Sequence, residues 1–285
     1  MDTGQYHGFD VAIHDPGVVV ATFNQPERLN GMTGAMKRDL VEFVYQAQMD
    51  DAARVVVFTG TGRAFCAGDD LSGAYNDGAR RPEKVPPMPL GHHNAIGTYD
   101  GLRVISQGVN RAIRDLDKLT IAAVNGFAIQ TGFSLALACD FRLASTEAKL
   151  GSATLRFGLL PDEGGQWLLV QHLGVARTMD FLMRKRIVSG AEALELGLVH
   201  EVCAPDRLEA RTLEFATELA NGPQVAMRML KRSVLAAAEL SFAQACDEIA
   251  SKTAVTDWHP DANEGVAAFR DKREPRFNRW LEERG

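Results

Sequence analysis

Short runs of β-branched and other apolar residues recur in the first half of the chain and predict buried strands. The clearest runs are residues 18–24 (VVVATFN), 55–59 (VVVFT) and 121–124 (IAAV). Uninterrupted apolar runs of this length are typical of strands that are covered on both faces. Two shorter strands are expected at residues 141–144 and 149–152.

Helical periodicity appears between these runs. Thr33 is expected to be the N-cap of a helix that ends near Asp51. Its apolar stripe consists of Met36, Leu40, Val44 and Ala47. A second helical stripe covers residues 101–117, and residues 132–139 predict a short buried helix. The alternation of strand, helix and strand predicts an α/β protein with a parallel sheet and crossover helices.

The chain changes character in two places. Residues 72–100 are rich in proline and glycine and poor in large apolar residues, which predicts a long loop or insertion. After Ala204, consecutive helices are expected over residues 206–220, 223–239, 241–252 and 261–273. We therefore predict a core of residues 1–204, with 72–100 as an insertion, and a helical region of residues 205–285. Such a region is usually either a lid or an oligomer interface, and we expect it to mediate oligomerisation.

Composition and charge narrow the range of partners. The chain has 285 residues, of which 46% are hydrophobic and 24% charged, the balance of a soluble globular protein. Lys and Arg number 31 against 37 Asp and Glu, which gives a net charge of −6. Proteins that bind nucleic acid or an anionic membrane surface are normally basic, so neither partner is expected. A small anionic ligand needs only a local basic patch and stays compatible with this charge.

Two further features bear on location. Residues 120–139 carry no charge and have the length of a membrane span, but Asn125 and Gln130 interrupt the run, which favours a buried strand, turn and helix. The N-terminal sequence MDTGQYHGFD has no features of a secretory signal. The cysteines stand singly, at Cys66, Cys139, Cys203 and Cys246. Because no CxxC pair or Cys/His run is present, we expect no disulfide framework, no metal site and a cytoplasmic location.

Two segments share a design in which an apolar strand leads through a glycine-containing turn to a presumed helix. They are residues 55–71 (VVVFTGTGRAFCAGDDL) and 120–140 (TIAAVNGFAIQTGFSLALACD). The start of a helix presents unpaired N–H groups and the positive end of the helix dipole. Two such amides could stabilise the oxyanion that develops on one carbonyl oxygen. Strand–turn–helix units are also ordinary in α/β proteins, so the design alone leaves both interpretations open.

Five motifs, taken in order, resemble the crotonase family, also called the enoyl-CoA hydratase/isomerase superfamily. They are NQPERLNGM, RAFCAGDDL, AAVNGFAIQTGFSLALACDFRLAS, GLLPDEGGQWLLVQHLG and EGVAAFRDKREPRF. The resemblance runs over residues 8–278. It implies a ββα spiral core with a helical C-terminal extension, assembled as a homotrimer or homohexamer. It also implies an acyl-CoA substrate, which brings coenzyme A with it, and no tightly bound cofactor.

By this resemblance, two backbone N–H groups hold the thioester oxygen. They fall on Asp69 and Thr131, and Gln130 and Thr131 replace two glycines of the family pattern. The two glutamates of a typical hydratase fall on Ser134 and Thr154. Hydroxyl groups cannot replace a pair of carboxylates as general acid and base near neutral pH. Efficient hydration by the usual pair is therefore not expected.

The PDEGG segment supplies a different acid. Asp162 falls where isomerase and dehalogenase members of the family place a carboxylate, and Glu163 beside it is the second candidate. One carboxylate near an oxyanion hole suits proton abstraction next to the thioester and reprotonation elsewhere, which moves a double bond. The alternative is that Asp162 and Glu163 only begin a helix, since acids favour a first turn.

The resemblance also assigns contacts to the substrate and its coenzyme A. The expected binding residues are Arg28, Ala67, Asp69, Asp70, Leu71, Thr131, Ser134, Thr154 and Lys272. Asp70 is alternatively a residue that orders its own turn. The basic residues around Lys272 are alternatively the charged face of a helix.

Three functions remain in view. The first is an isomerase-like acyl-CoA enzyme, and the second is a hydratase or lyase with rearranged acid–base groups. The third is a catalytically silent protein that binds a CoA thioester, which the loss of both glutamates keeps open. The insertion is expected to cover the acyl pocket, and its His92 and His93 are either lid residues or solvated loop residues.

Overall fold

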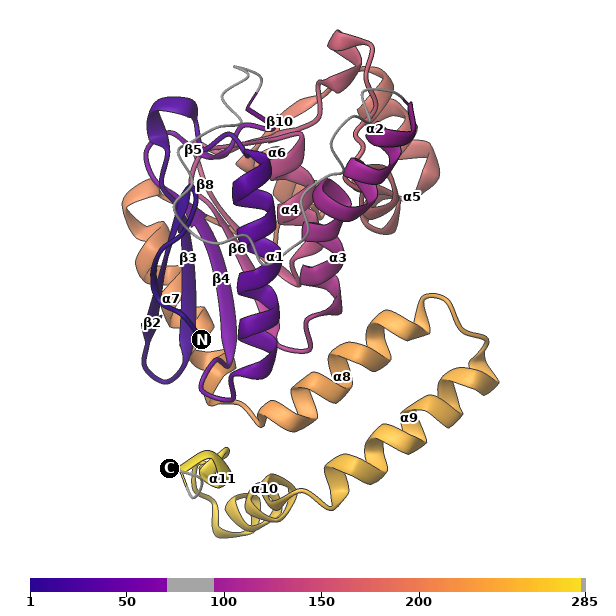
Figure 1. The fold of residues 1–285 in the computed structure, drawn as a ribbon. Coiled ribbons are helices and arrows are strands. Elements are labelled where there is room, and N and C mark those ends of the chain that lie inside the picture. The colour runs from indigo at the N-terminus through magenta and orange to yellow at the C-terminus, as the bar shows by residue number, and fades with distance from the viewer. Residues whose placement is uncertain (71–94, 283–285) are drawn as a thin grey trace.

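The predicted parallel strands form one large sheet at the centre of the molecule (Figure 1). The computed structural model describes residues 1–70 and 95–282. The strand order is β1 (Gly4–Gln5), β2 (Phe9–His14), β3 (Val18–Phe23), β4 (Val55–Gly60), β6 (Leu119–Val124), β8 (Phe141–Ser145) and β11 (Glu201–Cys203). Neighbours from β3 to β11 pair in parallel, whereas β1, β2 and β3 are antiparallel.

A smaller sheet lies beside the large one. Its order is β10 (Ile187–Ser189), β9 (Lys149–Gly151), β7 (Phe127–Ile129) and β5 (Ala64–Cys66). β4, β6 and β8 of the large sheet are each followed, after a short turn, by β5, β7 or β9 of the small one. This repeated step between the two sheets is the ββα spiral that the resemblance implies, so the expected fold class is confirmed.

Helices cover both faces of the large sheet. α1 (Gly34–Met49), α3 (Gln107–Asp115) and α4 (Thr131–Ala138) pack on one face, and α7 (Pro205–Asn221) packs on the other. Alternate residues of β4 divide between the two cores: Val56 and Phe58 join the first, and Val55 and Val57 join the second. Burial on both sides explains why this strand is a continuous apolar run.

The predicted helix after Thr33 is confirmed, and its start has a clear cause. The Thr33 side chain accepts a hydrogen bond from the Met36 N–H at 3.1 Å, which satisfies one of the free donors of α1. The uncharged stretch 120–139 folds into β6, β7 and α4 rather than one long helix. Within residues 1–70 and 95–282, no helix is both long and apolar enough to cross a membrane.

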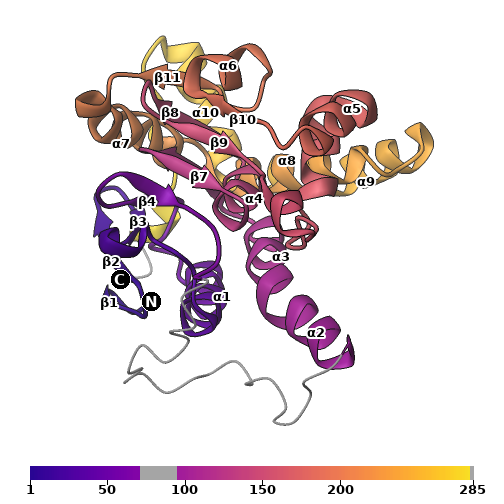
Figure 2. The ribbon, with the colours of Figure 1, turned by 90° about the horizontal axis from the view of Figure 1, so that it is seen from above.

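The remaining helices complete the chain. They are α2 (Ala95–Gly101), α5 (Gly165–Met183), α6 (Gly190–Glu195), α8 (Gln224–Ala237), α9 (Phe242–Asp257), α10 (Pro260–Asp271) and α11 (Arg279–Glu282). Figure 2 shows α2 and α3 as one rod, which a π-helical turn at Leu102–Ser106 joins. The four helices predicted after Ala204 match α7 to α10 to within a few residues, except that α9 extends further, to Asp257.

Two expectations need correction. The expected insertion 72–100 is too long at its end, because Ala95–Gly101 is helical and continues into α3. The rest of that segment lies outside the described residues. Strands β1, β2, β5, β7, β10 and β11 and helix α6 were not predicted, and a helix near α5 was expected only in the alternative in which Asp162 and Glu163 begin one. β5 and β7 are only three residues long and merge with glycine-containing turns, so they leave no periodic signal.

Candidate active site

The turn after β5 presents the first expected oxyanion donor. Met32 N–H donates to the Gly68 carbonyl at 2.9 Å, and Asp70 N–H donates to the Met32 carbonyl at 3.1 Å. These two bonds hold the turn on both sides of Asp69, and no backbone hydrogen bond within the described residues uses the Asp69 N–H. Gly68 has φ +113°, a conformation that favours glycine. The turn therefore leaves the Asp69 amide available.

The N-terminus of α4 presents the second expected oxyanion donor, the main-chain N–H of Thr131. Thr131 is its first residue, a position at which the N–H has no partner inside the helix. Gln130 before it has φ +53°, so it keeps a conformation that glycine adopts easily. A Cβ on Gly132 would overlap the Cys66 carbonyl oxygen, which means that only glycine lets α4 pack this closely on β5. Gln130 therefore holds a glycine-like conformation directly before the first residue of α4.

The side chains of the two donor residues touch. Thr131 Oγ1 lies 2.7 Å from Asp69 Oδ1. The Asp69 carboxylate also accepts a hydrogen bond of 2.8 Å from Lys37 Nζ, and Lys37 is buried in α1 and bonded to Ser106 Oγ at 2.9 Å. The structure thus brings the two predicted donor residues together and adds a cation beside them.

The PDEGG segment lies against the same helix. Helix α3 holds its backbone: Gln107 donates to the Asp162 carbonyl at 3.0 Å and Asn110 to the Glu163 carbonyl at 2.9 Å. Glu163 Oε1 lies 2.6 Å from Thr131 Oγ1, and the residue is only 2% exposed. Asp162 is half-buried, and its carboxylate makes no hydrogen bond or ion pair with another described residue.

The alternative that these acids only start a helix is wrong in its simple form. α5 begins at Gly165, its N-cap is Gly164, and no side chain caps it. Both acids precede the cap. Neither carboxylate is therefore needed to cap α5.

Burial controls the protonation of Glu163. It raises the pKa of this carboxyl to about 7, and the nearby Asp162 and Asp69 charges act in the same direction. The hydrogen bond with Thr131 and the charge of Lys37 oppose this shift. Glu163 is therefore a carboxyl group that can exchange a proton near neutral pH.

Ser134 and Thr154 stand where the family resemblance expects the two glutamates of a hydratase. The Thr154 hydroxyl donates to the Gln130 side-chain oxygen, which also accepts a bond of 2.8 Å from Ser152. This fixes the Gln130 amide so that its nitrogen donates to Glu163 Oε2 at 3.3 Å. Ser134 is buried, and a Cβ on Gly165 would lie 2.5 Å from its hydroxyl oxygen. A carboxylate at 134 would have little room there.

The expected coenzyme A residues are only partly assembled. Arg28 Nη1 pairs with Asp70 Oδ2 at 3.2 Å, and Ala67 N–H donates to the Leu29 carbonyl at 3.0 Å, so Arg28, Ala67 and Asp70 form one edge of the site. Lys272 ends α10, which Figure 1 shows well apart from α4, so one chain does not bring it to this site. Leu71, His92 and His93 lie outside the described residues.

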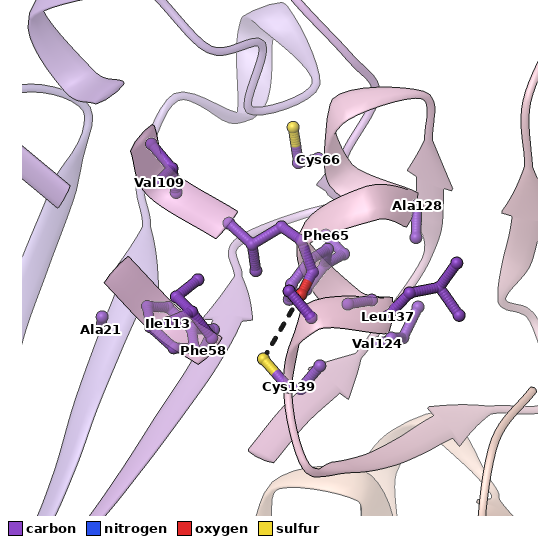
Figure 3. Packing of buried hydrophobic residues seen from close by; sticks show 14 of the residues in the cluster. Ala21, Phe58, Phe65, Cys66, Val109, Ile113, Val124, Ala128, Leu137 and Cys139 are labelled. Carbon is purple, nitrogen blue, oxygen red and sulfur yellow. Dashed lines mark hydrogen bonds between the residues drawn. The ribbon is translucent and has the colours of Figure 1, made fainter. Parts of the chain in front are cut away.

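Neither a reactive thiolate nor a metal site accompanies these residues in the part of the chain that the structure describes. Cys66 is fully buried beside α4 (Figure 3), and burial raises the pKa of its thiol to about 12, so it is not a thiolate nucleophile. Of the residues that the structure describes, no three His, Cys, Asp or Glu are grouped as metal ligands.

Sequence reasoning missed Lys37, Ser106, Gln107 and Asn110. Lys37 could have been found, since it lies one turn from Thr33 and Leu40 on the apolar stripe of α1, where a charged residue is unusual. Gln107 and Asn110 carry no such signal. Their role depends on α3 lying beside the PDEGG turn, a contact between segments more than fifty positions apart.

Comparison with known proteins identifies the family of the chain. The family model described as enoyl-CoA hydratase/isomerase matches residues 14–280. The chain is 33% identical to 1,2-epoxyphenylacetyl-CoA isomerase of Escherichia coli K12, over 92% of this chain and 95% of that one. It is 26% identical to 4-chlorobenzoyl coenzyme A dehalogenase-1 of an Arthrobacter species, over 95% and 94%.

Solved structures of enoyl-CoA hydratases have the same fold as this chain. The crystal structure of an enoyl-CoA hydratase from Bacillus anthracis superposes with a TM-score of 0.84 at 28% identity, covering 95% of this chain and 98% of that one. Both the family match and the relatives span nearly the whole chain. The chain therefore belongs to the enoyl-CoA hydratase/isomerase family.

Proposed function

We propose that the protein moves a double bond in an acyl-CoA thioester through an enolate. The observation that carries this proposal is that the turn after β5, the start of α4 and the PDEGG turn meet, with 2.7 and 2.6 Å contacts joining Asp69, Thr131 and Glu163. The main-chain N–H groups of Asp69 and Thr131 would receive the thioester oxygen. Removing one such donor typically costs an enzyme about 10²–10³-fold in turnover.

Asp162 is the proposed base. Its carboxylate takes a proton from the saturated carbon next to the carbonyl group of a 3-enoyl thioester, or next to the double bond of a 2-enoyl thioester, and the electron pair of that C–H bond is delocalised onto the carbonyl oxygen. The resulting dienolate then takes a proton from the same carboxyl at a different carbon, which regenerates the carboxylate. Support comes from its half-buried carboxylate, which has no partner among the described side chains, and from a relative named trans-2-decenoyl-[acyl-carrier-protein] isomerase, of Streptococcus mutans, at 27% identity.

Hydration is a weaker candidate. It needs a second carboxylate to position and deprotonate water, and the two positions that the family resemblance assigns to that pair carry the hydroxyl groups of Ser134 and Thr154. A lyase or hydratase with rearranged groups, or a silent thioester-binding protein, would replace our proposal if no double bond moved.

We also propose a homotrimer or homohexamer formed through the helices after Ala204, in the cytoplasm. Support comes from large apolar side chains that a single chain leaves in solvent, including Phe242 at 86% and Trp258 at 91% exposure. A neighbouring chain would then bring Lys272 toward the phosphates of coenzyme A. Light scattering at micromolar concentration should show three or six chains, and a stable monomer would contradict this.

A panel of 2-enoyl-, 3-enoyl- and aromatic acyl-CoAs tests the reaction. NMR of the products in D₂O should show one thioester whose double bond moves and which gains deuterium. Hydroxyacyl products would favour the hydratase instead. Binding without any exchange would favour the silent protein.

A further inference from the structure

The hydroxyl of Thr131 lies between two carboxyl groups. Its oxygen is 2.7 Å from Asp69 Oδ1 and 2.6 Å from Glu163 Oε1, both within the range of charge-assisted hydrogen bonds. A threonine hydroxyl has one hydrogen to donate. Two ionised carboxylates can only accept, so they cannot both be bonded to it. Both contacts are hydrogen bonds only if one of the two carboxyl groups carries a proton and donates it.

The surroundings of Asp69 and Glu163 indicate which of the two carboxyl groups carries the proton. Asp69 faces Lys37 Nζ at 2.8 Å, and its side chain is 34% exposed, so a cation and water both favour its charged form. Glu163 is 2% exposed, and the only side chains that hydrogen-bond its carboxyl, within the part of the chain described, are the neutral Gln130 and Thr131. The proton therefore belongs on Glu163.

The charges that face Glu163 agree with this assignment. Asp162 on its own turn and Asp69 on the turn after β5 both disfavour a further negative charge, and the cation Lys37 on α1 acts in the opposite direction, with a smaller effect. Cys66 on β5 also faces it but stays neutral. From α3, Asn110 reaches only its backbone carbonyl.

We propose that the side chains of Thr131 and Glu163 are positioning residues for the oxyanion hole: protonated Glu163 donates to Thr131, and Thr131 donates to Asp69. The chain of two bonds ties together the two residues whose main-chain amides receive the thioester oxygen. This inference rests on the proposed function, since it assigns side-chain roles within that hole.

Loss of the Glu163 proton would weaken the hole in two ways. The single hydrogen of Thr131 could then turn to Glu163 and leave Asp69. A further negative charge would also lie near the oxygen on which negative charge develops. The hole should consequently polarise a thioester more strongly below the pKa of Glu163 than above it.

The test uses 4-(dimethylamino)cinnamoyl-CoA, whose absorption moves to longer wavelength when its carbonyl group is polarised. Spectra of the bound probe are recorded from about pH 6 to about pH 9, a range that brackets the titration of Glu163. The proteins compared are the parent, Glu163→Gln, Thr131→Val and Thr131→Ser. Thr212→Val is the matched control, because Thr212 is a buried helical threonine whose hydroxyl has no partner in the described structure.

The parent should show a red shift that decreases with a midpoint near the pKa of Glu163, and Thr212→Val should behave identically. Glu163→Gln can donate permanently to Thr131, so its red shift should stay at the low-pH value throughout. Thr131→Val should give a smaller shift at every pH, and Thr131→Ser should restore the parent profile. The proposal is overturned if Glu163→Gln retains the pH step or if Thr131→Val polarises the probe as the parent does.

A second readout needs no ligand. Infrared difference spectra of the parent minus Glu163→Gln at about pH 6 should contain the C=O stretch of a protonated carboxyl group, which disappears with the same midpoint. If the probe binds nowhere but this band is present, the proposed function fails and the assignment of the proton stands. If the probe binds and the band is absent, the relay is wrong and the function stands.

Discussion

The candidate site has an oxyanion side and an acid–base side, and the two differ in how far their proposed roles depend on the identity of the side chains. The proposed oxyanion side uses the main-chain groups of Asp69 and Thr131, and Gln130 before Thr131 holds a glycine-like conformation with φ +53°. The proposed acid–base side uses side-chain chemistry: Ser134 and Thr154 stand where the family resemblance expects carboxylates, and Asp162 and Glu163 are the proposed carboxyl groups. A backbone donor survives a change of side chain as long as the fold is kept, whereas a proton carrier does not. The first side should therefore be shared with the relatives, and the second should define the reaction.

The largest expected effect is on the acid–base side. Asp162→Asn keeps the size of the side chain and removes the base, so deuterium exchange next to the thioester should fall by about 10²–10⁴-fold. NMR of a productive thioester in D₂O measures this. If Asp162→Asn exchanges as fast as the parent while Glu163→Gln does not, the base is Glu163 and the assignment along the turn is off by one residue.

The next effect tests the oxyanion side through its backbone. Gly132→Ala would push a methyl group into the Cys66 carbonyl and displace α4 from β5, so exchange should fall by about 10²-fold, as for loss of one donor. Gly34→Ala is the control, because only the far end of Arg38 lies within 4 Å of its new methyl group. Equal rates for Gly132→Ala and the parent would show that the spacing of the two amides is unimportant.

The burial of Glu163 should also appear in the stability of the protein. Its pKa is raised from 4.5 to about 7 in the folded state, so the folded protein binds more protons than the unfolded chain between these values. Stability should therefore decrease as pH rises from about 4.5 to about 7, by up to about 3 kcal/mol, and then level off. Urea unfolding at both ends of this window measures it. Glu163→Gln should remove most of the decrease, and an unchanged pH profile would count against a buried protonated carboxyl.

The smallest effects should come from Ser134 and Thr154, the two positions at which a typical hydratase has glutamates. Ser134→Ala and Thr154→Val remove one hydroxyl each and no proton carrier, so exchange should change by less than about tenfold. Thr154→Val should have the larger effect of the two, since it removes one of the two hydrogen bonds that hold the Gln130 amide in contact with Glu163. A hundredfold loss in either variant would mean that the hydroxyl takes part in proton transfer.

The comparison of the two sides also explains what could be predicted from the sequence. Strands β3, β4, β6 and β8, helix α1 and the C-terminal helices have apolar runs or stripes, and Thr33 marks the start of α1, so local patterns sufficed for them. The motif resemblance located Asp69, Thr131 and Asp162. It did not give the contacts of Thr131 with Asp69 and Glu163, nor those of Lys37, because these depend on how segments remote in sequence pack together.

The most direct test of the account is a crystal structure with a non-hydrolysable CoA thioester analogue. We predict that the carbonyl oxygen lies about 2.7–3.2 Å from the main-chain nitrogens of both Asp69 and Thr131, with the Asp162 carboxylate facing the carbon from which it takes the proton. A complex in which the carbonyl group points away from both amides would contradict it.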